Sequence, residues 1–225
     1  VVDVLGADHI EQFPFVRNAV AALGGDPEKM ELVMHQFVTI TSQGEKVKQS
    51  TRRATFVTVD ELVEQVGADV FRFFMIERKP EGHLDFDLDL AQDQNWRKNP
   101  AYYVQYAHAR LCSVMRKAEA DGLPFDRELG FANLASLEAD QEKALMNRLA
   151  RFPEVVEHAA LSREPQQIAQ YLQDLAADFH TCYNAQKVMV DDAELRNARL
   201  ALGLATRQLI GNGLALLGVS APEEM

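Results

Sequence analysis

From Asn99 to the end, the chain consists mainly of long segments whose apolar residues recur every three or four positions, and this pattern limits the second half to helices. Asn99 followed by Pro100 is a favourable helix start, so a helix is predicted from there to about Asp121. Further helices are predicted over 140–161 with an interruption near Pro153, over 165–186 and over 192–217, with 123–132 as a connector. These segments predict an up-and-down bundle of about 125 residues, which is large enough to bury its own core.

The first part of the chain mixes strand and helix patterns. Val1–Leu5 predicts a buried strand that ends at Gly6, Phe13–Leu23 predicts a helix, and the β-branched and apolar run Glu31–Thr41 predicts a second strand, followed by a turn over Ser42–Glu45. A strand, helix and strand in this order are typical of a parallel α/β sheet.

Two short helices and one ambiguous segment follow. Thr58 with Glu61 three residues later is a capping box, and it predicts a helix to Val66 and a second helix over 68–78. The alternation of apolar and acidic residues over Leu84–Asp89 fits a strand, although a helix start stays possible. Because the composition changes near 95–100, we divide the chain into an α/β fragment, residues 1–97, and an all-α helical bundle, residues 98–225.

The charge distribution bears on possible partners. A net charge of −11 argues weakly against nucleic acid, which requires a basic surface. However, the segments 46–59 and 95–118 contain basic residues and no acidic ones, so an RNA could bind there locally. No apolar run reaches the ~20 residues of a membrane span. The two cysteines, Cys112 and Cys182, have no metal-ligand spacing and are expected to be buried thiols, and no metal site is predicted.

Gly6-Ala7-Asp8-His9 follows the first predicted strand and could form part of a nucleotide site. Ligands of open α/β sheets lie at the carboxyl ends of strands, where a carboxylate can accept hydrogen bonds from ribose hydroxyls. His9 could contact a purine or a phosphate. A solvated turn in which Asp8 caps the next helix explains the same residues equally well.

A basic segment, Val47-Lys48-Gln49-Ser50-Thr51-Arg52-Arg53, follows the second predicted strand. Closely spaced cations with a hydroxyl between them suit a polyphosphate whose charge grows during a reaction. A solvated basic loop is the alternative. The chain contains no Gly-x-x-x-x-Gly-Lys segment, so it is not a P-loop ATPase.

Lys48-Gln49-Ser50-Thr51-Arg52 resembles the Lys-Met-Ser-Lys-Ser signature of class I aminoacyl-tRNA synthetases, in a form similar to that of arginyl enzymes. Gly6-Ala7-Asp8-His9, the segment 56–62, Leu84-Asp85-Phe86-Asp87 and above all the segment from Asn99-Pro100 to Arg110 also resemble the arginyl-tRNA synthetase family. The segments 193–202 and 216–225 are similar to its helical anticodon-binding module. The resemblance therefore extends over essentially the whole chain, in the same order.

The resemblance implies that residues 1–97 are the C-terminal part of a Rossmann-type catalytic domain that forms arginyl-adenylate from arginine and ATP, with Mg²⁺. It implies that Gly6, Asp8 and His9 face the adenosine. It also implies that Lys48, Ser50 and Arg52 grip the phosphates, with Arg53 as a further ATP-binding residue. Gln49 and Thr51 depart from the signature, and the missing lysine leaves open which cation stabilises the leaving pyrophosphate.

A second class I signature, His-x-Gly-His, does not occur in the chain. The first residue is Val1 and lies inside a predicted strand, so we expect the sequence to begin within a larger protein. We therefore expect this chain alone neither to activate arginine nor to charge arginine tRNA.

The bundle offers candidate RNA contacts. Tyr106 and Arg110 share one helical face, and Tyr side chains and Arg planes stack well on unpaired bases. Tyr183 and Arg199 are further candidates, although each could belong to the core. The resemblance implies that Met225 lies near the anticodon. Trp96 is expected to pack at the domain boundary, and His180 to be structural or solvated.

Two alternatives remain from the sequence. One is a tRNA-binding module without catalysis, and the other is a different class I synthetase with the same helical domain, such as a cysteinyl enzyme. For the arginyl enzyme we further expect a cytoplasmic monomer that does not contact a membrane.

Overall fold

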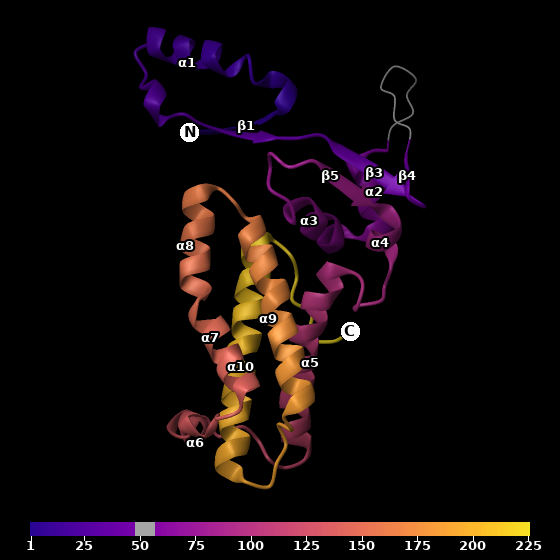
Figure 1. Ribbon diagram of the computed structural model, residues 1–225, viewed down its shortest axis with the longest axis vertical. Coiled ribbons are helices and arrows are strands. Elements are labelled where there is room, and N and C mark those ends of the chain that lie inside the picture. The colour runs from indigo at the N-terminus through magenta and orange to yellow at the C-terminus, as the bar shows by residue number, and fades with distance from the viewer. Residues whose placement is uncertain (48–56) are drawn as a thin grey trace.

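The computed structural model describes residues 1–47 and 57–225, and it places a small α/β part above a long helical bundle (Figure 1). The α/β part contains β1 (Val2–Gly6), η1 (Ala7–His9), α1 (Phe13–Ala22), η2 (Pro27–Lys29), β2 (Glu31–His35), β3 (Val38–Ser42), β4 (Glu45–Lys46), α2 (Val59–Val66), α3 (Ala68–Ile76), β5 (Leu84–Asp87) and α4 (Leu88–Gln92). The bundle contains α5 (Pro100–Ala120), α6 (Arg127–Ala132), η4 (Leu134–Ser136), α7 (Asp140–Ala150), α8 (Phe152–Ser162), α9 (Gln166–Ala185) and α10 (Ala193–Leu217).

The predicted start of α5 and both predicted ends of α10 are confirmed by their caps. The Asn99 side chain accepts hydrogen bonds from the amides of Ala101 (3.1 Å) and Tyr102 (3.4 Å) at the start of α5. Asp192 caps α10 in the same way, and Gly218 ends that helix in the left-handed region at φ 67°. The predicted interruption near Pro153 separates α7 from α8. The predicted connector over 123–132 contains the short helix α6, which packs on α10.

The capping box of Thr58 and Glu61 is also confirmed. Thr58 N donates to the Glu61 carboxylate (2.7 Å), and Glu61 N donates to the Thr58 hydroxyl (3.1 Å). The segment Leu84–Asp89, predicted as a strand or a helix start, contains both. The strand β5 ends at Asp87, and the Asp87 side chain caps the following helix α4 by accepting from Leu90 N (3.0 Å).

The predicted single strand over Glu31–Thr41 is wrong. The chain forms two strands that belong to different sheets, with β2 paired in parallel to β1 and β3 lying between β4 and β5. The change of partner occurs at Gln36, whose backbone N–H donates to the Pro80 carbonyl (2.8 Å) and not to a neighbouring strand. The parallel pairing of the first two strands agrees with the predicted α/β arrangement.

The prediction that the first strand is buried is also wrong for this chain. Val4 in β1 is 63% exposed, and Phe15 and Leu23 at α1 are 75% and 88% exposed. These apolar side chains mark a face that the described residues do not cover.

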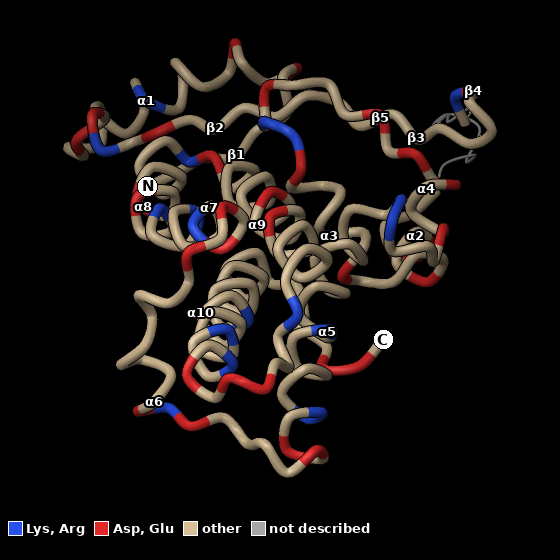
Figure 2. The backbone as a smooth tube through the Cα atoms, turned by 60° about the horizontal axis from the view of Figure 1, so that its bottom comes forward, with Lys and Arg blue, Asp and Glu red and all other residues tan. Residues whose placement is uncertain are grey.

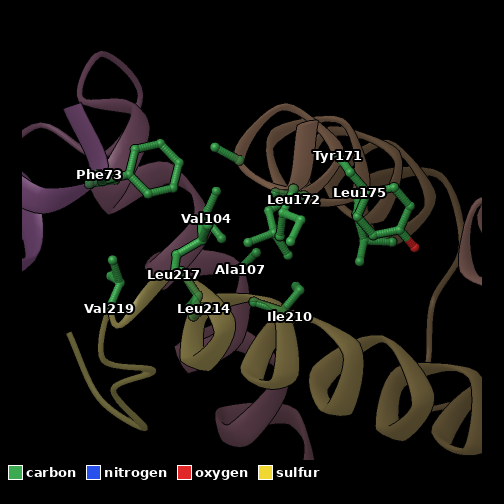
Figure 3. Packing of buried hydrophobic residues seen from close by; sticks show 14 of the residues in the cluster. Phe73, Val104, Ala107, Tyr171, Leu172, Leu175, Ile210, Leu214, Leu217 and Val219 are labelled. Carbon is green, nitrogen blue, oxygen red and sulfur yellow. The ribbon is translucent and has the colours of Figure 1, made fainter. Parts of the chain in front are cut away.

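The hydrophobic core crosses the predicted domain boundary. It includes Phe86 of β5. From Phe73 of α3 it extends to Val104 on α5 and then to the buried leucines of α9 and α10 (Figure 3). By length and composition α10 could cross a membrane, but it packs against α5, α6, α7 and α9 and contributes eleven buried residues to the bundle. Its apolar character is therefore explained by its central place in the fold.

An aromatic cluster lies where the connecting segment meets the bundle. The Trp96 ring stacks on Tyr106 with 4.2 Å between centroids, and His180 lies 5.3 Å from Trp96 and 5.1 Å from Tyr103. Both His180 ring nitrogens are buried without a hydrogen-bond partner among the described residues. Burial, assisted by the nearby Arg110 charge, lowers the pKa of His180 to about 4.

Two glycines of α10 test how tightly the bundle packs. A Cβ added at Gly213 would lie 2.6 Å from Leu172 Cδ2 and 3.1 Å from its Cγ, whereas one added at Gly211 would lie no closer than 3.7 Å to His108. Gly213→Ala should lower the free energy of unfolding by about 1–3 kcal/mol through overpacking. Gly211→Ala should raise it by about 0.5–1 kcal/mol through helix propensity. Urea unfolding checks both values, and the same sign for the two substitutions would contradict this packing.

The buried His180 predicts a pH dependence of stability. Between its unfolded pKa of about 6.5 and its folded pKa of about 4, the unfolded chain binds a proton that the folded chain does not. The free energy of unfolding should therefore fall as the pH falls from 6.5, by up to about 1.4 kcal/mol per pH unit from this group. Urea titrations at pH 7, 6 and 5 should give a shallower dependence for His180→Gln. Parallel curves for the two proteins would mean that His180 is not held neutral.

Candidate nucleic-acid interface

Four of the five predicted RNA-contacting residues line one open pocket of about 490 Å³ at the side of the bundle. The pocket is formed by α5, the end of α9 and the last residues of the chain. Its lining includes Tyr106, Arg110, Arg116, Lys117, Tyr183 and Met225. These residues lie far apart in the sequence, and the packing of α5 alongside α9, with the two helices running in the same direction, brings them together.

Arg110 is the centre of a stack on one wall of the pocket. Its guanidinium carbon lies 4.1 Å from the Tyr183 ring centroid and 5.9 Å from that of Tyr106, and the Trp96 ring lies behind Tyr106. Within the described residues no carboxylate lies within 4 Å of Arg110, so its charge is held by aromatic faces and not by an ion pair. A flat cation among aromatic rings suits stacking on unpaired bases.

The order of residues on α5 explains the stack. Tyr106 and Arg110 are four residues apart and therefore lie on one helical face. Val104, Ala107 and Leu111 on the opposite face are buried in the core, which fixes the rotation of the helix.

The tail closes the other side of the pocket and brings two acids to it. Glu224 pairs with Arg116 at 3.5 Å, and Arg116 also donates to the Glu223 carbonyl (3.2 Å). Figure 2 shows the acidic tail beside the basic residues of α5. Met225, at 58% exposed, leaves a thioether at the mouth of the pocket.

Arg199, the fifth predicted residue, lies elsewhere. Its side chain is only 12% exposed and pairs with the buried Glu142 at 2.7 Å. It also donates to the Lys187 carbonyl (2.6 Å) and to the Gln186 side chain (3.0 Å). Since its donors are occupied inside the bundle, the structure gives Arg199 a role in joining α7 to α10.

The predicted nucleotide residues lie at the carboxyl end of β1. Gly6 is the last residue of the strand and pairs with His35 of β2, and η1 carries Asp8 and His9. Both side chains are about half exposed, with His9 Nδ1 3.1 Å from Gln12 Oε1. A Cβ at Gly6 would lie 2.7 Å from Asp8 Oδ1. The absence of a side chain at Gly6 therefore leaves space for the Asp8 carboxylate.

The predicted phosphate-gripping residues Lys48, Ser50, Arg52 and Arg53 lie outside the described residues. Val47 and Val57 on either side of them pack against the core. In the described part of the chain, no group of three or more His, Cys, Asp or Glu residues has the arrangement of a metal site.

Sequence reasoning missed the place of Trp96, Arg116 and Lys117 in this interface. Trp96 supports the stack from behind, and the two cations line the pocket. All three fall within the acid-free segment 95–118, so its composition already carried the signal.

Comparisons with known proteins find arginine–tRNA ligases among the relatives of this chain. Over its whole length the chain is 54% identical to an arginine–tRNA ligase of Thioalkalivibrio sulfidiphilus and 50% identical to one of Coxiella burnetii. It spans 38% of the length of each.

Solved structures give the same result. The whole chain superimposes on 47% of an arginyl-tRNA synthetase structure from Campylobacter jejuni, with a TM-score of 0.87 and 31% identity. It also superimposes on 41% of the Thermus thermophilus arginyl-tRNA synthetase, with a TM-score of 0.79 and 28% identity.

Residues 104–225 match the DALR anticodon binding domain, and this segment contains Tyr106, Arg110, Tyr183 and Met225 of the pocket. Because the match covers more than half of the chain, the protein belongs to the DALR anticodon-binding domain family.

Proposed function

We propose that this chain is the C-terminal part of an arginine–tRNA ligase and that the pocket formed by α5, α9 and the tail binds the anticodon of arginine tRNA. The observation that carries the proposal is the Arg110 stack, which lies inside the segment that matches the anticodon-binding domain. The identity to arginine–tRNA ligases over all 225 residues supports the choice of amino acid.

The chemistry of the pocket fits an unpaired RNA base. Base stacking on aromatic and guanidinium planes contributes about 1–3 kcal/mol per base, and the Tyr106, Arg110 and Tyr183 planes provide it here. Lys117 adds a charge that can meet a phosphate. The Met225 thioether can pack against the base from the opposite side.

The α/β part is proposed to be the end of a Rossmann-type catalytic domain. Gly6, Asp8 and His9 at the carboxyl end of β1 would face the adenosine of MgATP, because parallel sheets bind nucleotides at this edge. Lys48, Ser50 and Arg52, with Arg53, would hold its phosphates while arginine displaces pyrophosphate. The apolar side chains of β1 and α1 that the described residues leave exposed support the proposal that further parts of a catalytic domain cover them. The monomeric state and the cytoplasmic location remain predictions.

Removal of the Arg110 stack should weaken RNA binding specifically. We expect Arg110→Ala to raise the Kd for arginine tRNA by about tenfold or more, because a base loses a stacking plane and a cation. Lys143→Ala is the matched control, since it removes one exposed charge on α7 away from the pocket. Fluorescence anisotropy at two salt concentrations measures both, and equal losses would show that the pocket is not the binding site.

Catalysis should require more than this chain. We expect no ATP–pyrophosphate exchange from the 225-residue chain, because it contains no His-x-Gly-His signature. In the complete protein, Lys48→Ala should lower the exchange rate by about 10²-fold through lost stabilisation of the leaving phosphates. Lys46→Ala in β4, just before the signature, should change the rate little. ATP–pyrophosphate exchange by the 225-residue chain alone would refute the proposal that arginine activation requires further parts of the enzyme.

A further inference from the structure

The seven residues after Gly218 form a tail that is fixed in place by residues of both parts of the molecule. Val219 is buried in the core (Figure 3). The chain then runs beside α5 (Figure 1), and its last three residues line the pocket. Before the tail begins, Arg72 Nε of α3 donates to the Leu217 carbonyl at 2.6 Å. The tail therefore leaves α10 already in contact with α3.

Three residues, which we call the tail clasp, hold its middle: Asp69 at the start of α3, Gln105 of α5 and Ser220 of the tail. One Asp69 carboxylate oxygen accepts from the Ser220 N–H at 3.1 Å, and the other accepts from the Ser220 hydroxyl. Gln105 Nε2 donates to Asp69 Oδ2 and to the Ser220 carbonyl, each at 3.0 Å. Since Gln105 is only 3% exposed, the clasp has a rigid base.

Two further contacts lead from the clasp to the pocket. His108 Nδ1 donates to the Pro222 carbonyl at 2.9 Å, and Arg116 donates to the Glu223 carbonyl at 3.2 Å. Both residues belong to α5, the helix that also carries Tyr106 and Arg110. The tail contacts thus continue to the residues that precede Met225.

We infer that Asp69 is a positioning residue for recognition of the anticodon, because it fixes the tail so that Met225 forms the pocket wall facing the Arg110 stack. This inference rests on the proposed function. Asp69 lies in the α/β part and does not line the pocket, so its effect on RNA must pass through Ser220 and the tail. A tail ordered in advance costs a bound RNA less conformational entropy than one that must be ordered on binding.

The tail itself can be tested without RNA. In Asp69→Ala, hydrogen exchange at the Ser220 amide should accelerate at least about tenfold, because its hydrogen-bond acceptor is removed. Asp60→Ala is the matched control, as it removes another acid from the first turn of a helix in the α/β part. Unchanged exchange in Asp69→Ala would overturn the inference.

The decisive experiment measures the Kd for arginine tRNA and for the same RNA with an altered anticodon, using the complete protein. The Kd for the altered RNA divided by the Kd for arginine tRNA measures recognition of the anticodon. A general loss of stability changes both Kd values alike and leaves this ratio unchanged. Asp69→Ala and Met225→Ala should each reduce this ratio by about tenfold, and the double variant should reduce it no further, because both remove the same wall. Ser220→Ala is the second variant, for use if Asp69→Ala does not fold. Ser220 is exposed and lies outside any helix, and its substitution should also reduce the ratio.

The outcomes separate the two proposals. Equal binding of the two RNAs by the unaltered protein would refute the proposed function and with it the role of Asp69. A preference in the unaltered protein that survives in both Asp69→Ala and Ser220→Ala would refute the positioning role alone. Additive losses in the double variant would show that Asp69 acts by a route that does not include Met225.

Discussion

The buried side chain of Asn99 fixes the direction in which the bundle leaves the α/β part. Its amide nitrogen donates to the carbonyls of Leu90, Ala91 and Asp93, and its oxygen accepts from the first amides of α5. One fully buried group therefore satisfies backbone groups on both sides of the join. An aspartate could supply only the acceptor, and an alanine neither, so the join depends on a side chain that donates and accepts at once.

The pocket proposed to bind RNA and the tail beside it both depend on the placement of α5. One face of this helix carries Val104 and Ala107 into the core, a second carries Gln105 to the tail, and a third carries Tyr106 and Arg110 to the pocket. The helical period separates these roles without any of them interfering with another. A rotation of α5 would move the Arg110 stack and the tail contacts together, so the pocket and the core depend on the same residues of this helix.

The sequence predicted local structure well because caps and helical periods are local. Asn99, Thr58 and Gly218 each act within a few residues of their own position, and the structure places helix ends where they indicated. The failures concern partners distant in sequence. The break at Gln36 depends on Pro80, and the internal position of Arg199 depends on Glu142 on another helix. Likewise, nothing near Asp69 in the sequence indicates its bond to Ser220, 151 residues away.

The charge of the chain and the makeup of the pocket together define the kind of RNA binding expected here. With a net charge of −11, most of the surface repels nucleic acid, and in the pocket Glu224 already occupies one of the cations, Arg116. Few phosphates can then be neutralised, so the affinity should fall only gently with salt, at a slope of roughly 0.7 per phosphate for single-stranded RNA. Most of the binding energy must come from stacking on the Arg110 wall. Stacking requires bases that are unpaired and splayed out, so a duplex of the same charge gains little from this surface. An RNA that binds this acidic chain through the pocket would therefore be selected by its unpaired bases more than by its charge.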